Sequence, residues 1–187
     1  FAIAIPVGVL ANRSTHPTVS YPCFVKVQIP VGGRGKAGGI VKASNAPELE
    51  QAIHKLVGAT VRGQRVHECR IEQPASGQEC YISLMLDPSS GKVIILMSAQ
   101  GGIEVEQHSA GGAMLQQQAN FEASAVKLAA QELAQQMPKF AQAALTQAAH
   151  QLCDALFTLE LTLAEINPLF VQADGSWIAG DAKLVAD

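Results

Sequence analysis

The sequence contains few charged and few aromatic side chains for its size. Of its 187 residues, 16% are charged and 5% are aromatic, against about 25% charged in an average soluble domain. The formal net charge is −3 and no run of basic residues occurs. This excludes nucleic-acid binding, because phosphate neutralisation supplies most non-specific affinity for DNA and RNA. With 48% apolar residues, the composition is more typical of a domain that contacts a partner.

Long hydrophobic runs and paired cysteines are also missing. The longest apolar stretch, residues 1–10, is interrupted by Pro6 and Gly8 and is far shorter than the roughly 20 residues that span a bilayer, which excludes a membrane protein. The same stretch has no basic region and does not begin with Met, which argues against a signal peptide and is compatible with a chain trimmed upstream. The four cysteines form no C-x-x-C pair, so we expect neither zinc nor disulfides, and reduced thiols in the cytoplasm.

Apolar periodicity predicts a domain of mixed strands and helices. Residues 24–29 alternate apolar and polar side chains, as a half-buried strand does. Asn45 is a candidate N-cap with Glu48 three residues later, and the apolar positions that follow predict a short helix ending near Gly58. Further strands are expected at 68–73, 80–86 and 93–98, the last two joined by the turn sequence Asp87–Gly91.

The C-terminal half predicts two helices and a hairpin. The Ala-, Leu- and Gln-rich region 121–160 is interrupted once, by Pro138, which can open a second helix. Strands near 163–171 and 176–184 flank Ala173-Asp174-Gly175, a hairpin signal. The buried face of the second helix is predicted to comprise Phe140, Ala144, Leu145, Ala148, Leu152, Ala155, Leu156 and Leu159. The histidines share no motif and are interpreted as solvated: His16, His54, His67, His108 and His150.

A glycine-rich segment directly after the first strand is the first candidate functional element. Gly32–Gly39 has five glycines in eight positions, so its backbone can approach a ligand closely and direct several N–H groups at one anion, which favours phosphate. It is not a P-loop, because Pro30 and Ala37 stand where that motif needs Gly and Ser or Thr, and its G-x-G-x-x-G spacing is not followed by a helix. The alternative is a flexible surface hairpin in which Arg34 and Lys36 are merely solvated.

Oxygen-bearing side chains on either side of the C-terminal turn are the second candidate. If the hairpin loop is centred on Asp174, paired positions sum to 348, so Asn167 faces Asp181 and Glu165 faces Lys183 on one face of the sheet. Carboxylate and amide oxygens side by side can bind Mg²⁺, which completes its shell with water and nucleotide phosphates. The alternative is a cross-strand Glu165–Lys183 ion pair beside an Asn-Pro turn.

Five blocks of sequence stand in an order that is informative. They are Val25–Gln28 leading into the glycine-rich segment, Glu79–Ile82 before Asp87–Ser90, Gln100–Glu104, Glu165–Leu169 and Asp181–Lys183. Together they resemble the β subunit of succinyl-CoA synthetase (ADP-forming succinate–CoA ligase), and specifically its ATP-grasp domain. Because the blocks cover most of the chain, the resemblance is more specific than any single glycine motif.

The resemblance implies an α+β ATP-grasp fold of two subdomains with the nucleotide cleft between them. The N-terminal subdomain is expected over residues 7–74 with the phosphate loop, and the C-terminal subdomain over 75–187, together with 1–6, with the magnesium-binding hairpin. By the same resemblance, the residues expected to bind ATP are Lys26 at the phosphates, Gly33, Arg34 and Gly35 in the phosphate loop, Glu72 and Ala75 at the nucleotide hinge, and Glu79. Asn167 and Asp181 are the expected Mg²⁺ ligands.

In the family, this domain exchanges phosphate between Mg-ATP and a phosphohistidine carried by the α subunit, and the phosphohistidine then drives acyl-CoA formation elsewhere. The resemblance therefore implies ATP and Mg²⁺ as cofactors and an α subunit as partner. It assigns no catalytic side chain to this chain, whose physical task would be to position the phosphates and neutralise their charge.

The sequence also departs from the family pattern. The segment between Gly8 and Lys26 is too short for the helix that the family places there, so the first subdomain is expected to be cut down. Pro30-Val31 replaces a His-Ala pair and Ser109–Asn120 follows the family poorly, which puts nucleotide affinity in question. The chain stops just after Asp181–Leu184, where the family continues into a flavodoxin-like domain, so we expect that this chain alone cannot complete an acyl-CoA ligation.

Two other functions stay open at the level of the sequence. The ATP-grasp domain of another carboxylate–CoA ligase, of the malate–CoA or citrate-cleaving type, shares the nucleotide machinery. A degenerate nucleotide-binding or interaction module without turnover would account for the shortened first subdomain.

Overall fold

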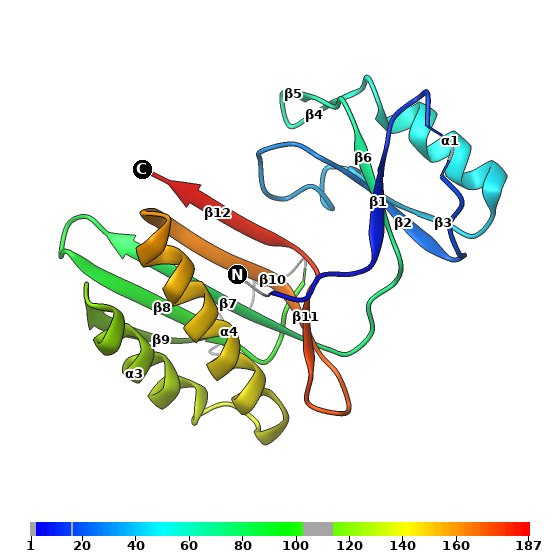
Figure 1. Ribbon diagram of the computed structural model, residues 1–187. Helices are drawn as coiled ribbons and strands as arrows, with labels where there is room; N and C mark the ends of the chain where they lie inside the picture. The colour runs from blue at the N-terminus through cyan, green and yellow to red at the C-terminus, as the bar shows by residue number, and fades with distance from the viewer. Residues whose placement is uncertain (1–2, 16, 103–113) are drawn as a thin grey trace. The chain divides into compact units, whose positions relative to one another are not determined.

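The computed structural model describes residues 3–15, 17–102 and 114–187. Internal contacts divide the chain into two compact units, shown in Figure 1. The N-terminal unit is Pro6–Pro74, and the C-terminal unit is Phe1–Ile5 together with Ala75–Asp187. Each unit has its own hydrophobic core.

The N-terminal unit is an antiparallel sheet of four strands in the order β1-β6-β2-β3, with one helix packed against it. Residues Cys23, Val25 and Val27 alternate with more exposed neighbours along β2 and are fully buried, which is the pattern of a strand with one face in a core. The elements are β1 (Gly8–Ala11), β2 (Cys23–Val27), β3 (Ile40–Ala43), α1 (Ala46–Leu56), β4 (Thr60–Val61), β5 (Gln64–Arg65) and β6 (Cys69–Glu72).

Helix α1 begins at the predicted cap. The Asn45 side chain accepts a hydrogen bond from the Glu48 N–H at 3.0 Å, and the Glu48 carboxylate accepts one from the Ser44 N–H at 2.8 Å. The first bond satisfies an N–H group that the first helical turn leaves without a partner, and the second ties the residue before the cap to the helix. The bonds that Ser44 and Asn45 donate to the carboxylate also lower the pKa of Glu48.

The segment between β1 and β2, where the sequence predicts no helix, leaves apolar surface exposed. No helix forms in the described residues of 12–22, as predicted. Val9 is paired with the buried Ile71 across β1 and β6, yet 42% of it is exposed. The segment between β1 and β2 therefore leaves Val9 incompletely covered on β1, the edge strand of this sheet.

The C-terminal unit is a sheet in the order β11-β10-β7-β8-β9, with β12 also paired to β10. Helices α3 and α4 lie on one face of this sheet, α3 against β8 and β9 and α4 against β7 and β10 (Figure 1). The elements are β7 (Gln78–Asp87), β8 (Lys92–Ser98), β9 (Met114–Asn120), α3 (Ala123–Ala134), α4 (Lys139–Thr158), β10 (Leu161–Val171), β11 (Trp177–Ala179) and β12 (Ala182–Ala186).

The predicted buried face of α4 is partly wrong. Phe140 and Leu159 are 40% and 46% exposed, because they lie in the first turn and at the C-cap of the helix, at its two ends. Ala141, Ala149 and Cys153 are buried instead, and their small side chains let α4 approach its neighbours closely. The interpretation of His150 as solvated is also wrong in one respect, since its Nε2 atom is buried without a hydrogen-bond partner among the described residues.

Replacing Asn45 by Ala tests the cap of α1. We expect a loss of about 1 kcal/mol in the free energy of unfolding of the N-terminal unit, because the Glu48 N–H loses its acceptor. This loss would be measured as faster hydrogen exchange of the buried β2 amides, followed by mass spectrometry. Gln51→Ala, an exposed change in the same helix, is the control, and equal exchange rates in the two variants would contradict the capping account.

Candidate functional site

Strand β10 keeps the predicted register with the chain that returns to it. Leu169 pairs with Ala179 in β11, and Glu165 pairs with Lys183 in β12, so paired positions sum to 348 from Leu163 to the end of β10. The register shifts by one residue only before Leu163, where Leu161 pairs with Ala186. Between them the Asn167 N–H donates to the backbone oxygen of Asp181 at 2.9 Å. The backbones of the two predicted Mg²⁺ ligands are therefore adjacent, with Asp181 in the short connection between β11 and β12.

On its other side, the register of β10 with β7 shifts by one residue at Asn167 and Pro168. Ile166 pairs with Ile82 and Leu169 with Cys80, so two residues of β10, Asn167 and Pro168, oppose Tyr81 alone. Such a bulge re-aims the side chain that it carries. It places the Asn167 amide beside Gly102, which follows β8.

Asn167 and Gly102 form a two-way hydrogen-bonded pair. The Gly102 N–H donates to Asn167 Oδ1 at 2.7 Å, and Asn167 Nδ2 donates to the Gly102 oxygen at 3.2 Å. An amide can donate and accept in this way, whereas a carboxylate can only accept. Because Oδ1 has a second lone pair, the pair leaves Asn167 able to act as a metal ligand.

Glu79 lies against the same glycine turn. The Gly101 N–H donates to the Glu79 backbone oxygen at 2.9 Å, and a Cβ on Gly102 would collide with Glu79 Oε2. Gly102 also has a φ of 91°, in the left-handed region that favours glycine. The absence of a side chain at Gly102 thus lets the Glu79 carboxylate and the Asn167 amide both lie against this turn. Ile103 and Glu104, which belong to the same sequence block, lie outside the described residues.

Glu165 is held by a tyrosine rather than by a lysine. Tyr81 Oη donates to Glu165 Oε2 at 2.9 Å from the neighbouring strand β7. In the part of the chain that the structure describes, no ion pair joins Glu165 to Lys183. The alternative interpretation of this hairpin as a cross-strand ion pair is therefore wrong.

In the N-terminal unit, Glu72 anchors Lys26. Lys26 Nζ lies 2.5 Å from Glu72 Oε2, and Arg70 Nε lies 2.9 Å from Glu72 Oε1. Glu72 is buried and is bonded to Arg70, but Oε2 accepts no well-aligned hydrogen bond, so its attraction to Lys26 is that of an ion pair. One buried carboxylate between two cations fixes the end of the Lys26 side chain.

The glycine-rich segment is folded back on itself. The Gly39 N–H donates to the Arg34 oxygen at 2.8 Å and the Gly38 N–H to the Gly35 oxygen at 3.0 Å. Arg34 Nη1 donates to the Val27 oxygen at 2.8 Å, so the alternative of a merely solvated Arg34 is wrong. The N–H groups of Gly33 and Gly35 have no protein acceptor among the described residues, which leaves them able to bind an anion.

The predicted site residues fall in both units. Lys26, Gly33, Arg34, Gly35 and Glu72 belong to the N-terminal unit. Ala75 is the residue at which the C-terminal unit resumes, and this unit also contains Glu79, Asn167 and Asp181.

The two units carry opposite net charges, which the net charge of −3 for the whole chain does not reveal. The N-terminal unit has nine Lys and Arg against four Asp and Glu, a net charge of +5. The C-terminal unit has four against twelve, a net charge of −8. Counting charge by unit would have found that the basic unit carries the candidate phosphate loop and the acidic unit the candidate metal ligands.

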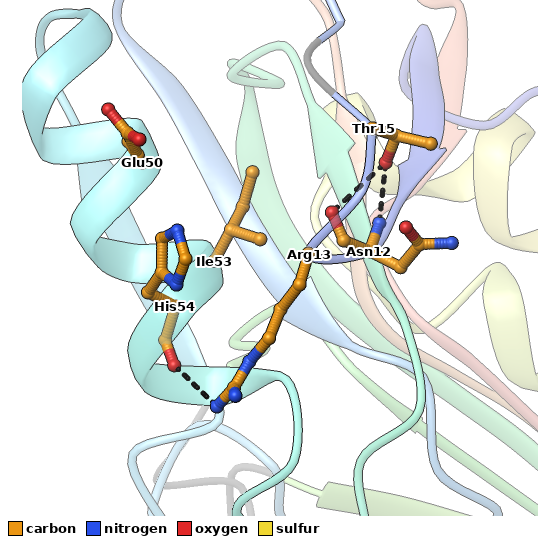
Figure 2. A pocket seen from close by; sticks show the side chains of 6 residues that line it. All are labelled: Asn12, Arg13, Thr15, Glu50, Ile53 and His54. Atoms are coloured by element: carbon orange, nitrogen blue, oxygen red, sulfur yellow. Dashed lines mark hydrogen bonds between the residues drawn. The ribbon is translucent and has the colours of Figure 1, made fainter.

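Other features lie apart from these residues. A small pocket between α1 and the turn after β1 is shown in Figure 2, where Arg13 Nη2 donates to the His54 oxygen at 3.1 Å. None of the predicted site residues lines it; the lining residues are Asn12, Arg13, Thr15, Glu50, Ile53 and His54. Burial raises the pKa of Cys69, Cys80 and Cys153 to about 11, which makes these thiols poor nucleophiles.

Within 3–15, 17–102 and 114–187, no group of three or more His, Cys, Asp or Glu side chains could hold an ion. A two-ligand site of hard oxygens suits Mg²⁺, which keeps several waters. In the same ranges, no helix is both long and apolar enough to cross a membrane.

Comparison with solved structures defines the class of fold. The chain is similar to a protein from Pyrococcus horikoshii, with a TM-score of 0.72 and 17% identity over 99% of this chain and 85% of that one. It is also similar to ATP citrate lyase from Methanothrix soehngenii, with a TM-score of 0.69 and 16% identity over 96% of this chain and 44% of that one. At these identities the likeness concerns the fold, and it agrees with the predicted α+β architecture.

Sequence comparison gives the family. A model of the ATP-grasp domain matches residues 11–171, and the chain belongs to this family. It is 35% identical to the ADP-forming succinate–CoA ligase subunit beta of Chloroflexus aurantiacus, over 94% of this chain and 48% of that protein. Identity to the corresponding subunit of Aquifex aeolicus is 34%, over 100% of this chain and 52% of that protein. The predicted resemblance is confirmed, and the chain spans about half the length of these relatives.

Substitution of Asn167 tests the pair with Gly102. Asn167→Ala leaves both Gly102 groups without their partner, and Asn167→Asp sets a carboxylate against the Gly102 oxygen, so we expect each to lower the stability of the C-terminal unit by about 1–2 kcal/mol. Trp177, the only tryptophan, is buried in this unit, so its fluorescence during urea unfolding measures the change. Asn120→Asp, at an exposed residue, is the matched control. A fully stable Asn167→Asp variant would contradict the account.

Proposed function

We propose that this chain binds Mg-ATP and is the nucleotide-binding portion of a succinate–CoA ligase β subunit. The observation that supports the proposal most directly is the pairing of Asn167 with Asp181 across the β10 hairpin, at 2.9 Å between backbone N and O. It brings the backbones of an amide-bearing and a carboxylate-bearing residue together at the end of the hairpin. The similarity to two ADP-forming succinate–CoA ligase β subunits supports the same reading.

In this proposal the N-terminal unit binds the phosphates. Lys26 supplies a positive charge that Glu72 holds in position, and the Gly33 and Gly35 N–H groups donate to phosphate oxygens. The φ of 70° at Gly33 lies in the left-handed region that favours glycine. Arg34 adds charge at the end of β2, where its guanidinium already caps the Val27 oxygen.

The C-terminal unit supplies the metal ligands. Asn167 Oδ1 and the Asp181 carboxylate would hold Mg²⁺, and the chemistry of these oxygens fits that ion. When bound, Mg²⁺ neutralises charge on the phosphates. Gly102 holds the Asn167 amide so that one lone pair of Oδ1 is used by the protein and the other remains for the ion.

The reaction proposed is exchange of a phosphoryl group between ATP and a phosphohistidine on a partner α subunit, which then drives formation of an acyl-CoA. The chain's residues contribute position and charge to this step, since binding, orientation and charge neutralisation account for most catalysis of phosphoryl transfer. The chain matches 48% of the Chloroflexus aurantiacus subunit, and the proposal assigns acyl transfer to CoA to regions outside this match.

A module that binds nucleotide without turnover is the second candidate. It is favoured by one observation, the absence of a helix in the described residues of 12–22, which leaves Val9 42% exposed. Phosphorylation of an added α subunit by ATP would support the ligase, whereas binding without phosphorylation would support the module.

Calorimetric titration of ATP with and without Mg²⁺ tests the proposed binding. We expect magnesium-dependent binding that weakens about tenfold or more in Asp181→Asn and in Lys26→Met, because each loses a charged contact worth about 1.5–3 kcal/mol. Asp187→Asn and Lys55→Met are matched controls at exposed positions, and their affinity should stay near that of the unsubstituted chain. The proposal would be contradicted if only the two control variants lost ATP affinity, or if ATP bound equally well with and without Mg²⁺.

A further inference from the structure

The short β4–β5 hairpin contains an arginine in an unfavourable backbone conformation. Its two-residue turn is Arg62-Gly63, with φ values of 48° and 78°. A turn with positive φ at both positions normally takes Asn or Asp before Gly, because other L-residues crowd their own backbone there. Arg62 thus occupies a position where its backbone conformation is disfavoured.

The hairpin is anchored on the exit of the glycine-rich loop. Val61 is only 7% exposed and belongs to the core of the N-terminal unit. A Cβ on Gly39 would lie 2.7 Å from Val27 Cγ2 and 3.5 Å from Val61 Cγ1. Gly39 therefore fits between β2 and the hairpin, which fixes the hairpin beside the loop.

This anchoring brings the Arg62 guanidinium onto Gly33. A Cβ on Gly33 would lie 2.8 Å from Arg62 Nη1 and 3.5 Å from Cζ, so the guanidinium occupies the space that a side chain at Gly33 would need. Within the described ranges no carboxylate forms an ion pair with Arg62. Its charge is therefore not neutralised by a protein group there.

The surroundings of Arg62 favour an anion. The Gly33 and Gly35 N–H groups have no acceptor in the described part of the protein, and the unit carries a net charge of +5. A planar guanidinium next to backbone N–H groups matches the geometry of phosphate oxygens.

We propose that Arg62 is a phosphate-binding residue, and that the β4–β5 hairpin adds its guanidinium to the Gly33–Gly35 amides to form a polyphosphate site. The inference rests on the proposed function, since the natural ligand would be the triphosphate of ATP. It assigns to the hairpin a binding role that explains an arginine at a disfavoured turn position.

Titration of inorganic triphosphate into the whole chain tests the site without requiring the nucleotide or Mg²⁺. For Arg62→Gln we expect affinity to fall about threefold to fivefold, the range of one partly solvated charged contact. Lys55→Gln removes the same charge from an exposed position on α1 and should leave the affinity of the unsubstituted chain. In amide NMR spectra, triphosphate should shift the Gly33 and Gly35 signals.

A second variant separates binding from folding. Arg62→Gly relieves the positive φ, so it should unfold at a higher urea concentration than the unsubstituted chain and yet lose the same triphosphate affinity as Arg62→Gln. Equal affinity of the Arg62→Gln and Lys55→Gln variants would overturn the proposal, as would no triphosphate binding by the unsubstituted chain. Triphosphate binding that depends on Arg62 in a chain with no magnesium-dependent ATP binding would uphold this site and count against the proposed function alone.

Discussion

The register of strand β10 is the constraint on which the candidate metal site depends. From Leu163 onward the strand keeps one register with β12 and β11, in which paired positions sum to 348, and its register with β7 shifts by one residue at Asn167 and Pro168. A one-residue slip on the hairpin side would turn Asp181 away from Asn167, because successive side chains point to opposite faces of a sheet. The bulge on the β7 side instead turns the Asn167 amide to Gly102, so one residue faces both a return strand and a glycine turn.

Charge is divided between the two units in a way that suits a magnesium–nucleotide complex. The unit with the glycine loop carries +5 and the unit with Asn167 and Asp181 carries −8. Surplus basic charge favours phosphate oxygens and surplus acidic charge favours a divalent cation. Within the basic unit, Glu72 limits the repulsion between Lys26 and Arg70 by bonding to both, which stabilises cations close together before a ligand is bound.

Much of this could be predicted from the sequence, where the signals are local. The Asn45 cap and the hairpin around Asp174 depend on residues a few positions apart, and both are confirmed. The pair between Asn167 and Gly102 could not be predicted, because it joins residues 65 positions apart through a bulge. The β9 strand was missed because Gln116, Gln117 and Gln118 break apolar alternation, although Gln117 bonds Glu132 of α3. The position of Arg62 beside Gly33 could not be predicted either, because the two residues lie in different loops.

The most direct test of the account is paramagnetic broadening of amide NMR signals by Mn²⁺, a hard-oxygen substitute for Mg²⁺. The account predicts that Mn²⁺ with ATP broadens the signals of Gly102, Asn167 and Asp181 first, and that Mn²⁺ alone at the same concentration broadens them less, because the nucleotide phosphates complete the coordination shell. Broadening that begins at other acidic residues, or that is unchanged by ATP, would contradict the claim that this hairpin holds the metal of a nucleotide complex.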